Sequence, residues 1–470
     1  MLFFIENNKA RAVIIRVLPV FILFALSNCG TVKTTEPLRQ IKVPVENFSK
    51  TGKKAVPVKW WNHLGIKQLN RLVDSVLLTA PDLKIAVSRL KQSIAVLKKK
   101  HALSYPSLSA TAGVSAGGKF NEKPASAFNA GFEVSWEIDV WGRLQSSRKS
   151  ALYDVRATEY EVLATFMTMT GQLVNSYLNI MILNRRADVL TELKATAEKY
   201  YFSQKMMYEA GSLESVDLIL QNQNLASLDG QLVDVKSQIS IEKNNLAVLS
   251  GKIVTDVKLE FPKEFPELPD IPKTGVPLKT VSKRPDVMKA LNLLRSADAQ
   301  LAVAVRERLP RFSLSFSVSD SVSKFSDIMK NWLWNIVLNV TAPIWKGGEI
   351  SAEIERSRAY ITEMTVNLHK VILNAINEIE IYLSREVHQK KYIESVLKQI
   401  EFSKLAVRDL EIRYKNGVTE FSVYLNALIS RQNLELSLIS ARGELIKIRG
   451  GLAKALAAAD FNLVNLKQRK

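Results

Sequence analysis

The sequence predicts a mixed α and β membrane protein that is internally duplicated, with four long strands and two very long helices per chain. Three observations support this prediction: an export signal, a repeat with an offset of about 204 residues, and strands of alternating polarity followed by long stretches without proline. The hydrophobic fraction is 47% and the mean hydropathy is close to zero. These values exclude a disordered chain and a bundle of transmembrane helices.

The chain begins with an export signal. Positive residues precede an apolar run over 17–26, which is too short to span a bilayer as a helix. The only cysteine, Cys29, follows this run, and the segment resembles a bacterial lipoprotein signal. We therefore expect a signal peptide over 1–28, a covalent lipid such as palmitate on Cys29, and a lipidated extension over 29–80. The alternative is an ordinary cleaved signal followed by an inert thiol.

The remainder of the chain is duplicated. Pro81-Asp82 recurs as Pro285-Asp286, Trp141 as Trp345, and Gly211, with a small drift in register, as Gly417. We therefore expect one repeat over 81–250 and a second over 285–459. The linker over 251–284 holds a cluster of prolines between 262 and 277, which favours an extended connection over a helix. A basic tail over 460–470 follows the second repeat.

Each repeat contains two predicted strands, at about 107–117 and 128–140 and at about 311–320 and 332–344. Their side chains alternate between apolar and polar, and tryptophans lie near the strand ends. This length and pattern fit tilted strands that cross a bilayer; the alternative is a sheet with one face on a soluble core. Four strands cannot close a barrel, and open edges in lipid would leave backbone groups unsatisfied. A barrel would therefore have to be shared between two or three chains.

The predicted helices are unusually long. No proline occurs over 144–209 or over 349–416, so each stretch can form one helix of about 100 Å. Two shorter helices, at 82–104 and 214–250, add up to nearly the same length. We expect a long antiparallel bundle in which each long helix lies beside two shorter ones.

Four segments resemble the TolC-like outer-membrane efflux factors, in their lipidated branch. They are 134–144 (VSWEIDVWGRL), 283–287 (KRPDV), 342–349 (APIWKGGE) and 413–417 (RYKNG). The resemblance implies a homotrimer in which twelve strands form an outer-membrane barrel and twelve helices form a periplasmic tunnel. It also implies a passive duct that exports small molecules such as drugs, with a periplasmic adaptor and an inner-membrane transporter as partners.

The resemblance also assigns candidate site residues. The helix ends farthest from the strands would be the periplasmic tip, where the family meets its adaptor; the residues there are Tyr208, Gly211, Tyr414 and Gly417. The alternative is that the glycines only cap helices and the tyrosines only pack. Gate positions implied by the family fall on Val423 and Asn426, and Asp217 is a possible substitute. On the barrel, Glu133, Glu137 and Asp139 are expected to face the lumen, or else to be solvated at a strand end.

Other functions fit the sequence less well. We find no motif of a hydrolase, a zinc peptidase or a nucleotide-binding enzyme, so we do not expect an enzyme. Four histidines and one cysteine make a metal site unexpected, and we expect no cofactor other than the lipid. The net charge of +19 is spread along helices, which argues against a nucleic-acid partner. The nearest alternative is the outer-membrane duct of a type I protein secretion system.

Overall fold

A computed structural model describes residues 47–57, 59–77, 79–121, 124–253, 261–262, 264–328 and 330–457. The expected signal peptide, the lipid-anchor position Cys29 and the basic tail lie outside these residues. All the described residues belong to one compact unit, Lys42–Lys470. None of its described helices is long and apolar enough to cross a membrane.

The two repeats contain the same elements in the same order. The first has α4 (Pro81–Ala102), β1 (Ser107–Gly117), β2 (Ala125–Ile138), α5 (Arg143–Glu209) and α6 (Ser215–Ser250). The second has α8 (Pro285–Arg306), β3 (Arg311–Val322), β4 (Leu333–Thr341), α9 (Glu349–Lys415) and α10 (Phe421–Leu456), with a short turn η3 (Phe325–Asp327) between its strands. Corresponding helices have equal lengths of 22, 67 and 36 residues. This equality is the structural form of the duplication.

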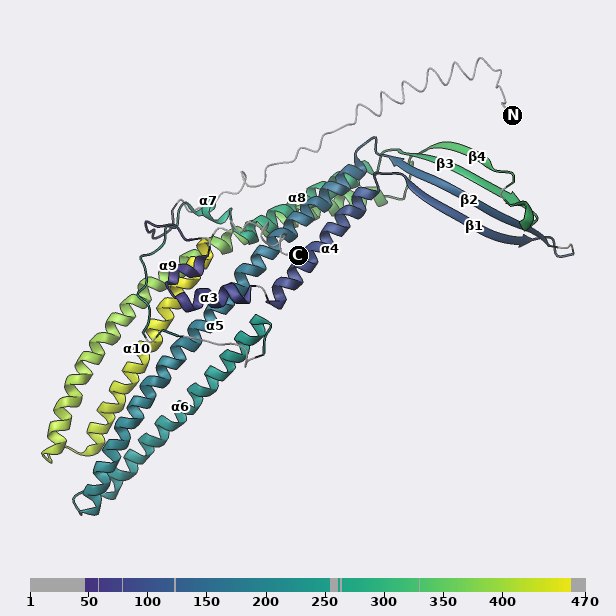
Figure 1. Cartoon of the computed structure of the whole chain (residues 1–470). Helices are drawn as coiled ribbons and strands as arrows, with labels where there is room; N and C mark the ends of the chain where they lie inside the picture. Colours follow the sequence, from purple (N-terminus) through teal and green to yellow (C-terminus); the bar gives the residue numbers. More distant parts are fainter. Residues whose placement is uncertain are drawn as a thin grey trace. The chain divides into compact units, whose positions relative to one another are not determined.

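The long helices organise the bundle. α5 packs against α4 and α6 on one side and against α8 and α10 on the other, while α9 packs against α8 and α10 (Figure 1). A left-handed glycine precedes each long helix, Gly142 at φ 76° and Gly348 at φ 88°. A glycine adopts this conformation without the steric penalty that a Cβ atom causes. The chain can therefore turn sharply from a strand into a helix of about 100 Å.

The four strands form one antiparallel sheet in the order β1-β2-β3-β4. The register sets Val134 opposite Leu108 and Phe316, so these apolar side chains share a face. The opposite face carries Glu133 between Ser109 and Ser317. The alternation in the sequence thus becomes one apolar face and one serine-rich face.

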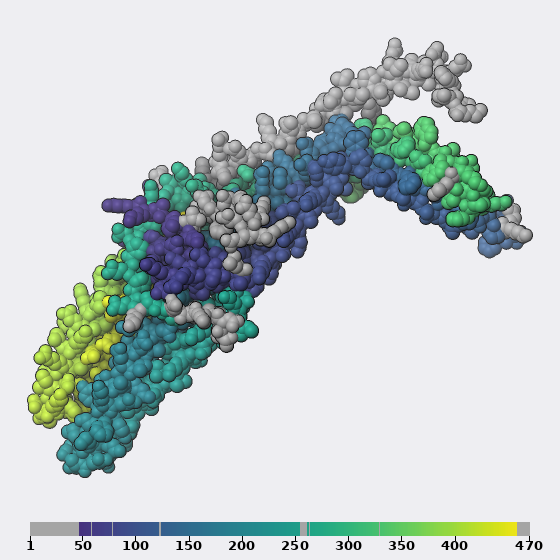
Figure 2. Space-filling model, in the orientation of Figure 1, coloured from purple at the N-terminus to yellow at the C-terminus, as the bar shows by residue number. Residues whose placement is uncertain are grey.

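The apolar face of this sheet is uncovered in the single chain. Leu108 on β1 is 72% exposed and Trp334 on β4 is 71% exposed. Figure 2 shows no helix over the visible face of the strands. Among the residues that the structure describes, the edge strand β1 pairs with β2 alone and the edge strand β4 pairs with β3 alone. The sheet is therefore an open segment with an apolar surface and two free edges.

Two strands end at places that the alternation did not predict. β2 begins at Ala125 and ends at Ile138, because Asp139 hydrogen-bonds to the start of α5 instead of continuing the ladder. β4 ends at Thr341, two residues before Pro343. Proline has no N–H to donate to a neighbouring strand, so the hydrogen-bonded ladder ends before Pro343. The apolar alternation in the sequence runs on past this point, which is why it predicted a longer strand.

The segment before the first repeat is folded as well. It forms η1 (Trp60–Leu64) and α3 (Lys67–Val76), and Trp60 and Trp61 are fully buried in a core cluster with α5 and α10. The expectation of a linker without helix was wrong at its C-terminal end, where α7 (Pro277–Val281) forms. Proline is well tolerated at the first position of a helix, because its missing N–H would be unpaired there in any case.

Candidate functional site

The two helical hairpins turn at the glycines that the sequence singled out. Gly211 has φ 72° and Gly417 has φ 68°. Beside them, the Ser212 N–H donates to the Met207 carbonyl at 2.8 Å and the Val418 N–H to the Arg413 carbonyl at 2.9 Å. These bonds close the ends of α5 and α9 in the manner of a glycine C-cap. Both turns lie one long helix away from the strands.

The two tip tyrosines have different environments. Tyr208 is 44% exposed at the end of α5. Tyr414 stacks on Tyr424 of α10, with ring centroids 6.0 Å apart and planes at 3°. The Tyr424 hydroxyl donates to the Tyr200 hydroxyl of α5 at 2.8 Å, which links the two hairpins. Burial, together with the neighbouring Tyr200, raises the pKa of Tyr424, so the Tyr424 hydroxyl keeps the proton that it donates. Tyr414 therefore serves packing, whereas Tyr208 is accessible to a partner.

The expected gate positions lie around the first turns of α6 and α10. Asp217 is in the first turn of α6, and its pKa is raised by burial and by the charges of Glu214 and Glu420. Val423 is 45% exposed. Asn426 lines a cleft of about 210 Å³ between α6 and α10. The carboxylates of the tip thus come from the start of α6 (Glu214 and Asp217) and from the N-cap of α10 (Glu420), whereas Val423 and Asn426 on α10 are neutral.

This cleft is polar but uncharged. Amides supply most of its polar lining, among them Asn224, Gln231 and Asn433. Asn224 is 6% exposed, and its Nδ2 has no acceptor among the described residues. The wall beside the tip can therefore hydrogen-bond to solutes without attracting either sign of charge.

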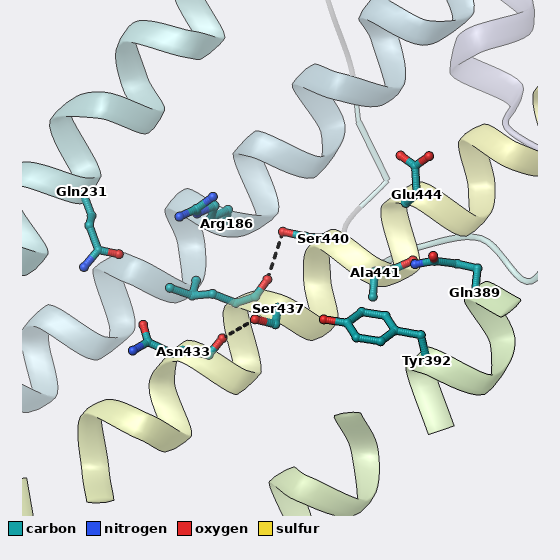
Figure 3. A pocket seen from close by; sticks show the side chains of 10 residues that line it. Arg186, Gln231, Gln389, Tyr392, Asn433, Ser437, Ser440, Ala441 and Glu444 are labelled. Carbon is teal, nitrogen blue, oxygen red and sulfur yellow. Dashed lines mark hydrogen bonds between the residues drawn. The ribbon is translucent and has the colours of Figure 1, made fainter. Parts of the chain in front are cut away.

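A larger cavity of about 540 Å³ adjoins the cleft, because Gln231 and Asn433 line both (Figure 3). All four helices of the two hairpins contribute to it: Arg186 from α5, Gln231 from α6, Tyr392 from α9 and Ser440 from α10. Its volume lies within the range of small-molecule sites in proteins. Sequence reasoning missed this cavity. The only signal was that Arg185 and Arg186 end the long uncharged stretch of α5.

The three carboxylates expected in the barrel lumen have three different roles. Glu133 lies on the serine-rich face, as the alternation predicts. Glu137 accepts from Arg143 at 2.7 and 2.8 Å. Asp139 accepts from the backbone N–H groups of Leu144 and Gln145 at 3.0 and 2.8 Å, and so fixes the start of α5. Two of the three therefore hold the junction between strand and helix.

Two tryptophans also fix this junction. The Trp136 indole N–H donates to the Ser104 carbonyl at 3.1 Å, and that of Trp141 to the Pro310 carbonyl at 2.8 Å. The counterpart of Trp141 in the second repeat is less enclosed: Trp345 is 86% exposed. An apolar ring with a polar edge suits the boundary between lipid and water.

Comparisons with known proteins agree with this architecture. The family model described as outer membrane efflux protein matches residues 72–252 and 276–458, one match per repeat. The chain is 28% identical to the pyoverdine export outer membrane protein OpmQ of Pseudomonas aeruginosa, over 85% of this chain and 86% of the relative. It is 21% identical to the cation efflux system protein CusC of Escherichia coli K12, over 92% and 90%.

Solved structures share the fold. The CmeC outer membrane channel of Campylobacter jejuni superimposes with a TM-score of 0.83 at 21% identity, covering 91% of this chain and 97% of that one. Because the family model covers most of the chain and matches it twice, the chain belongs to the outer membrane efflux protein family and is the outer-membrane channel component of an efflux system.

Proposed function

We propose that three copies of this chain form one duct, with their four-stranded sheets joined into a twelve-stranded barrel. The observation that carries the proposal is the open sheet: its edge strands β1 and β4 are free, and its apolar face is exposed. Free backbone groups at such edges cost several kcal/mol each in lipid. Pairing β4 of one copy with β1 of the next satisfies both edges. Three copies leave an aqueous passage, whereas eight strands would be filled by side chains.

The helices of the three copies would continue this passage as a tunnel in the periplasm. Each chain supplies two full-length helices and two pairs of shorter ones, so a trimer has twelve helical columns. The cleft between α6 and α10 and the cavity lined by α5, α6, α9 and α10 would form a polar part of the tunnel wall. No energy source is needed in this chain, because an inner-membrane transporter would drive transport.

The exposed tip is the proposed docking site for a periplasmic adaptor. Tyr208, Gly211 and Gly417 lie at or beside the two turns, and Val418 is 70% exposed. A lipid on Cys29 would add a second attachment to the outer membrane. The relatives named for pyoverdine export and for cation efflux support a small solute as the cargo.

Deleting the gene tests the proposed cargo class. We expect the deletion strain to accumulate small toxic compounds and to become sensitive to them, with normal levels of secreted proteins. The complementing variant Cys29→Ser is expected to lose incorporation of labelled palmitate. Loss of protein secretion with unchanged sensitivity would instead identify a protein secretion duct.

A further inference from the structure

The cavity between the two hairpins is lined by one arginine, Arg186. Arg186 lies on α5 and lines the cavity (Figure 3). Its Nε is buried, and no described residue accepts a hydrogen bond from it. The next residue differs: Arg185 is 43% exposed and lies 4.0 Å from Asp188. Leaving a buried charged donor unpaired is unfavourable, so Arg186 is suited to a ligand that supplies the acceptor.

The other polar groups of the cavity wall do not neutralise Arg186. The hydroxyls of Ser437 and Ser440 donate to carbonyls of their own helix, at 2.7 and 3.1 Å. The Gln389 amide donates to the Ala441 carbonyl at 2.9 Å. Glu444 is the acidic residue of the wall, and its carboxylate lies 3.9 Å from the Lys447 ammonium. Among the described residues, Glu444 does not form an ion pair with Arg186, so the charge of the Arg186 side chain is not neutralised by the cavity wall.

We propose that this cavity binds the carboxylate group of small organic anions, with Arg186 as the residue that holds it. The planar guanidinium can donate two parallel hydrogen bonds to one carboxylate. The neutral amides Gln231 and Asn433 are placed to hydrogen-bond to the rest of the molecule without selecting for charge. A single ion pair in an open cavity gives weak, reversible binding, as a site on a passage requires.

The role of the site in transport rests on the proposed function, but binding does not. In a trimer the three copies would contribute three Arg186 residues at one level of the tunnel, about 35 Å from the tip along α5. Solutes with a carboxylate would then pause there, whereas neutral and cationic solutes would pass without this contact. The site would thus favour anionic cargo.

Titration calorimetry on the purified full chain in detergent tests the proposal, with citrate as the probe and glucose as the neutral comparison. Citrate is expected to bind the wild-type protein, more weakly at high salt. Arg186→Gln should weaken citrate binding by about tenfold or more, and Arg186→Lys by less, because a lysine keeps the charge without the fork. Arg185→Gln removes the same charge from the adjacent residue and should change binding by less than about twofold.

The possible results distinguish a specific site at Arg186 from nonspecific binding of citrate to the protein. Citrate binding that is absent in the wild type, or that falls equally in Arg185→Gln and Arg186→Gln, overturns the site. Circular dichroism and particle size check that each variant is folded. If Arg186→Gln does not fold, Arg186→Lys carries the test, and unchanged citrate affinity in that variant overturns the site. Intact citrate binding in a strain that shows no export defect would contradict the proposed function alone.

Discussion

Arg449 of α10 and Glu386 of α9 form an ion pair in which both side chains are 1% exposed. Two hydrogen bonds of 2.9 and 2.5 Å join them, and Arg449 also donates to the Pro269 carbonyl of the linker. The pair therefore ties α9, α10 and the linker between the repeats at one point. The ammonium group of Lys390, whose side chain is exposed, lies 3.1 Å from the Glu386 carboxylate.

Removing one member of this pair should destabilise the protein strongly. Glu386→Gln leaves the buried Arg449 without its ion-pair partner, which typically costs about 3–5 kcal/mol, whereas Glu386 in Arg449→Met still has Lys390 at 3.1 Å and should lose less. Lys390→Gln removes an exposed neighbour and should cost about 1 kcal/mol or less. Denaturant unfolding followed by circular dichroism measures these differences. Equal losses in the free energy of unfolding for Lys390→Gln and Glu386→Gln would contradict a stabilising role of the buried ion pair.

The same pair predicts a loss of stability in acid. Burial works against the charge of Glu386, but Arg449 and Lys390 outweigh it and lower the pKa of that carboxyl. A carboxyl whose pKa is lowered by folding stabilises the protein above the ordinary pKa of about 4.3. The stabilisation is lost as the pH falls through the lowered value. Melting curves between pH 7 and pH 3 should show this loss in the wild type and less of it in Glu386→Gln.

The sheet predicts a difference between two adjacent residues of β4. Leu338 lies on the apolar face and Asn339 on the serine-rich face, and both are exposed in the single chain. A lysine at a lipid-facing position costs about 2–4 kcal/mol near the bilayer midplane. Leu338→Lys should therefore reduce the amount of protein assembled in outer membranes, as measured by fractionation. Asn339→Lys places the same charge in the lumen and should assemble normally; the reverse result would invert the faces.

Replacement by alanine should have opposite effects at two glycines, one in the turn after α9 and one inside α6. Gly417 has φ 68° with open space around its Cα, so Gly417→Ala is penalised by backbone strain alone, about 1–2 kcal/mol. Gly230 lies inside α6, also with open space, so Gly230→Ala should stabilise the helix by about 0.5–1 kcal/mol. Thermal unfolding of both variants measures the two changes. A stabilising Gly417→Ala would show that the turn is not left-handed.

Asp217 predicts a pH dependence confined to the tip. Because burial, Glu214 and Glu420 raise its pKa, the folded tip binds a proton more tightly than the unfolded chain. The tip should therefore become more stable as the pH falls from 7 through this raised value. Asp217→Asn should stabilise the tip at pH 7 and flatten the dependence. Hydrogen exchange at the Ser212 and Val418 amides reports it, and Glu209→Gln, on an exposed tip carboxylate, should have little effect.

The elements with a regular local pattern could be predicted from the sequence. Alternation identified the strand over Ser107–Gly117, and the absence of proline identified the two long helices. Because the chain is duplicated, each pattern occurs in both repeats, so an element predicted in one repeat could be checked in the other. These features depend on neighbours within a few residues, which a sequence displays directly.

Features formed by distant residues could not be predicted. Arg449 and Glu386 are 63 residues apart, and each reads as an ordinary charge on a long helix. Arg186 gains its significance only because α6, α9 and α10 surround it. η1 and α3 are short, and the burial of Trp60 and Trp61 depends on α5 and α10. The two tip tyrosines looked equivalent, and only packing against Tyr424 distinguishes Tyr414 from Tyr208.

The mass of the purified protein in detergent, measured by light scattering with the detergent contribution subtracted, tests the central claim most directly. The account predicts a particle of three chains, because twelve strands close a barrel around a passage. A monomer would contradict the shared barrel, since four strands leave two edges open in lipid. A dimer would also contradict it, because an eight-stranded barrel has no room for the passage of a duct.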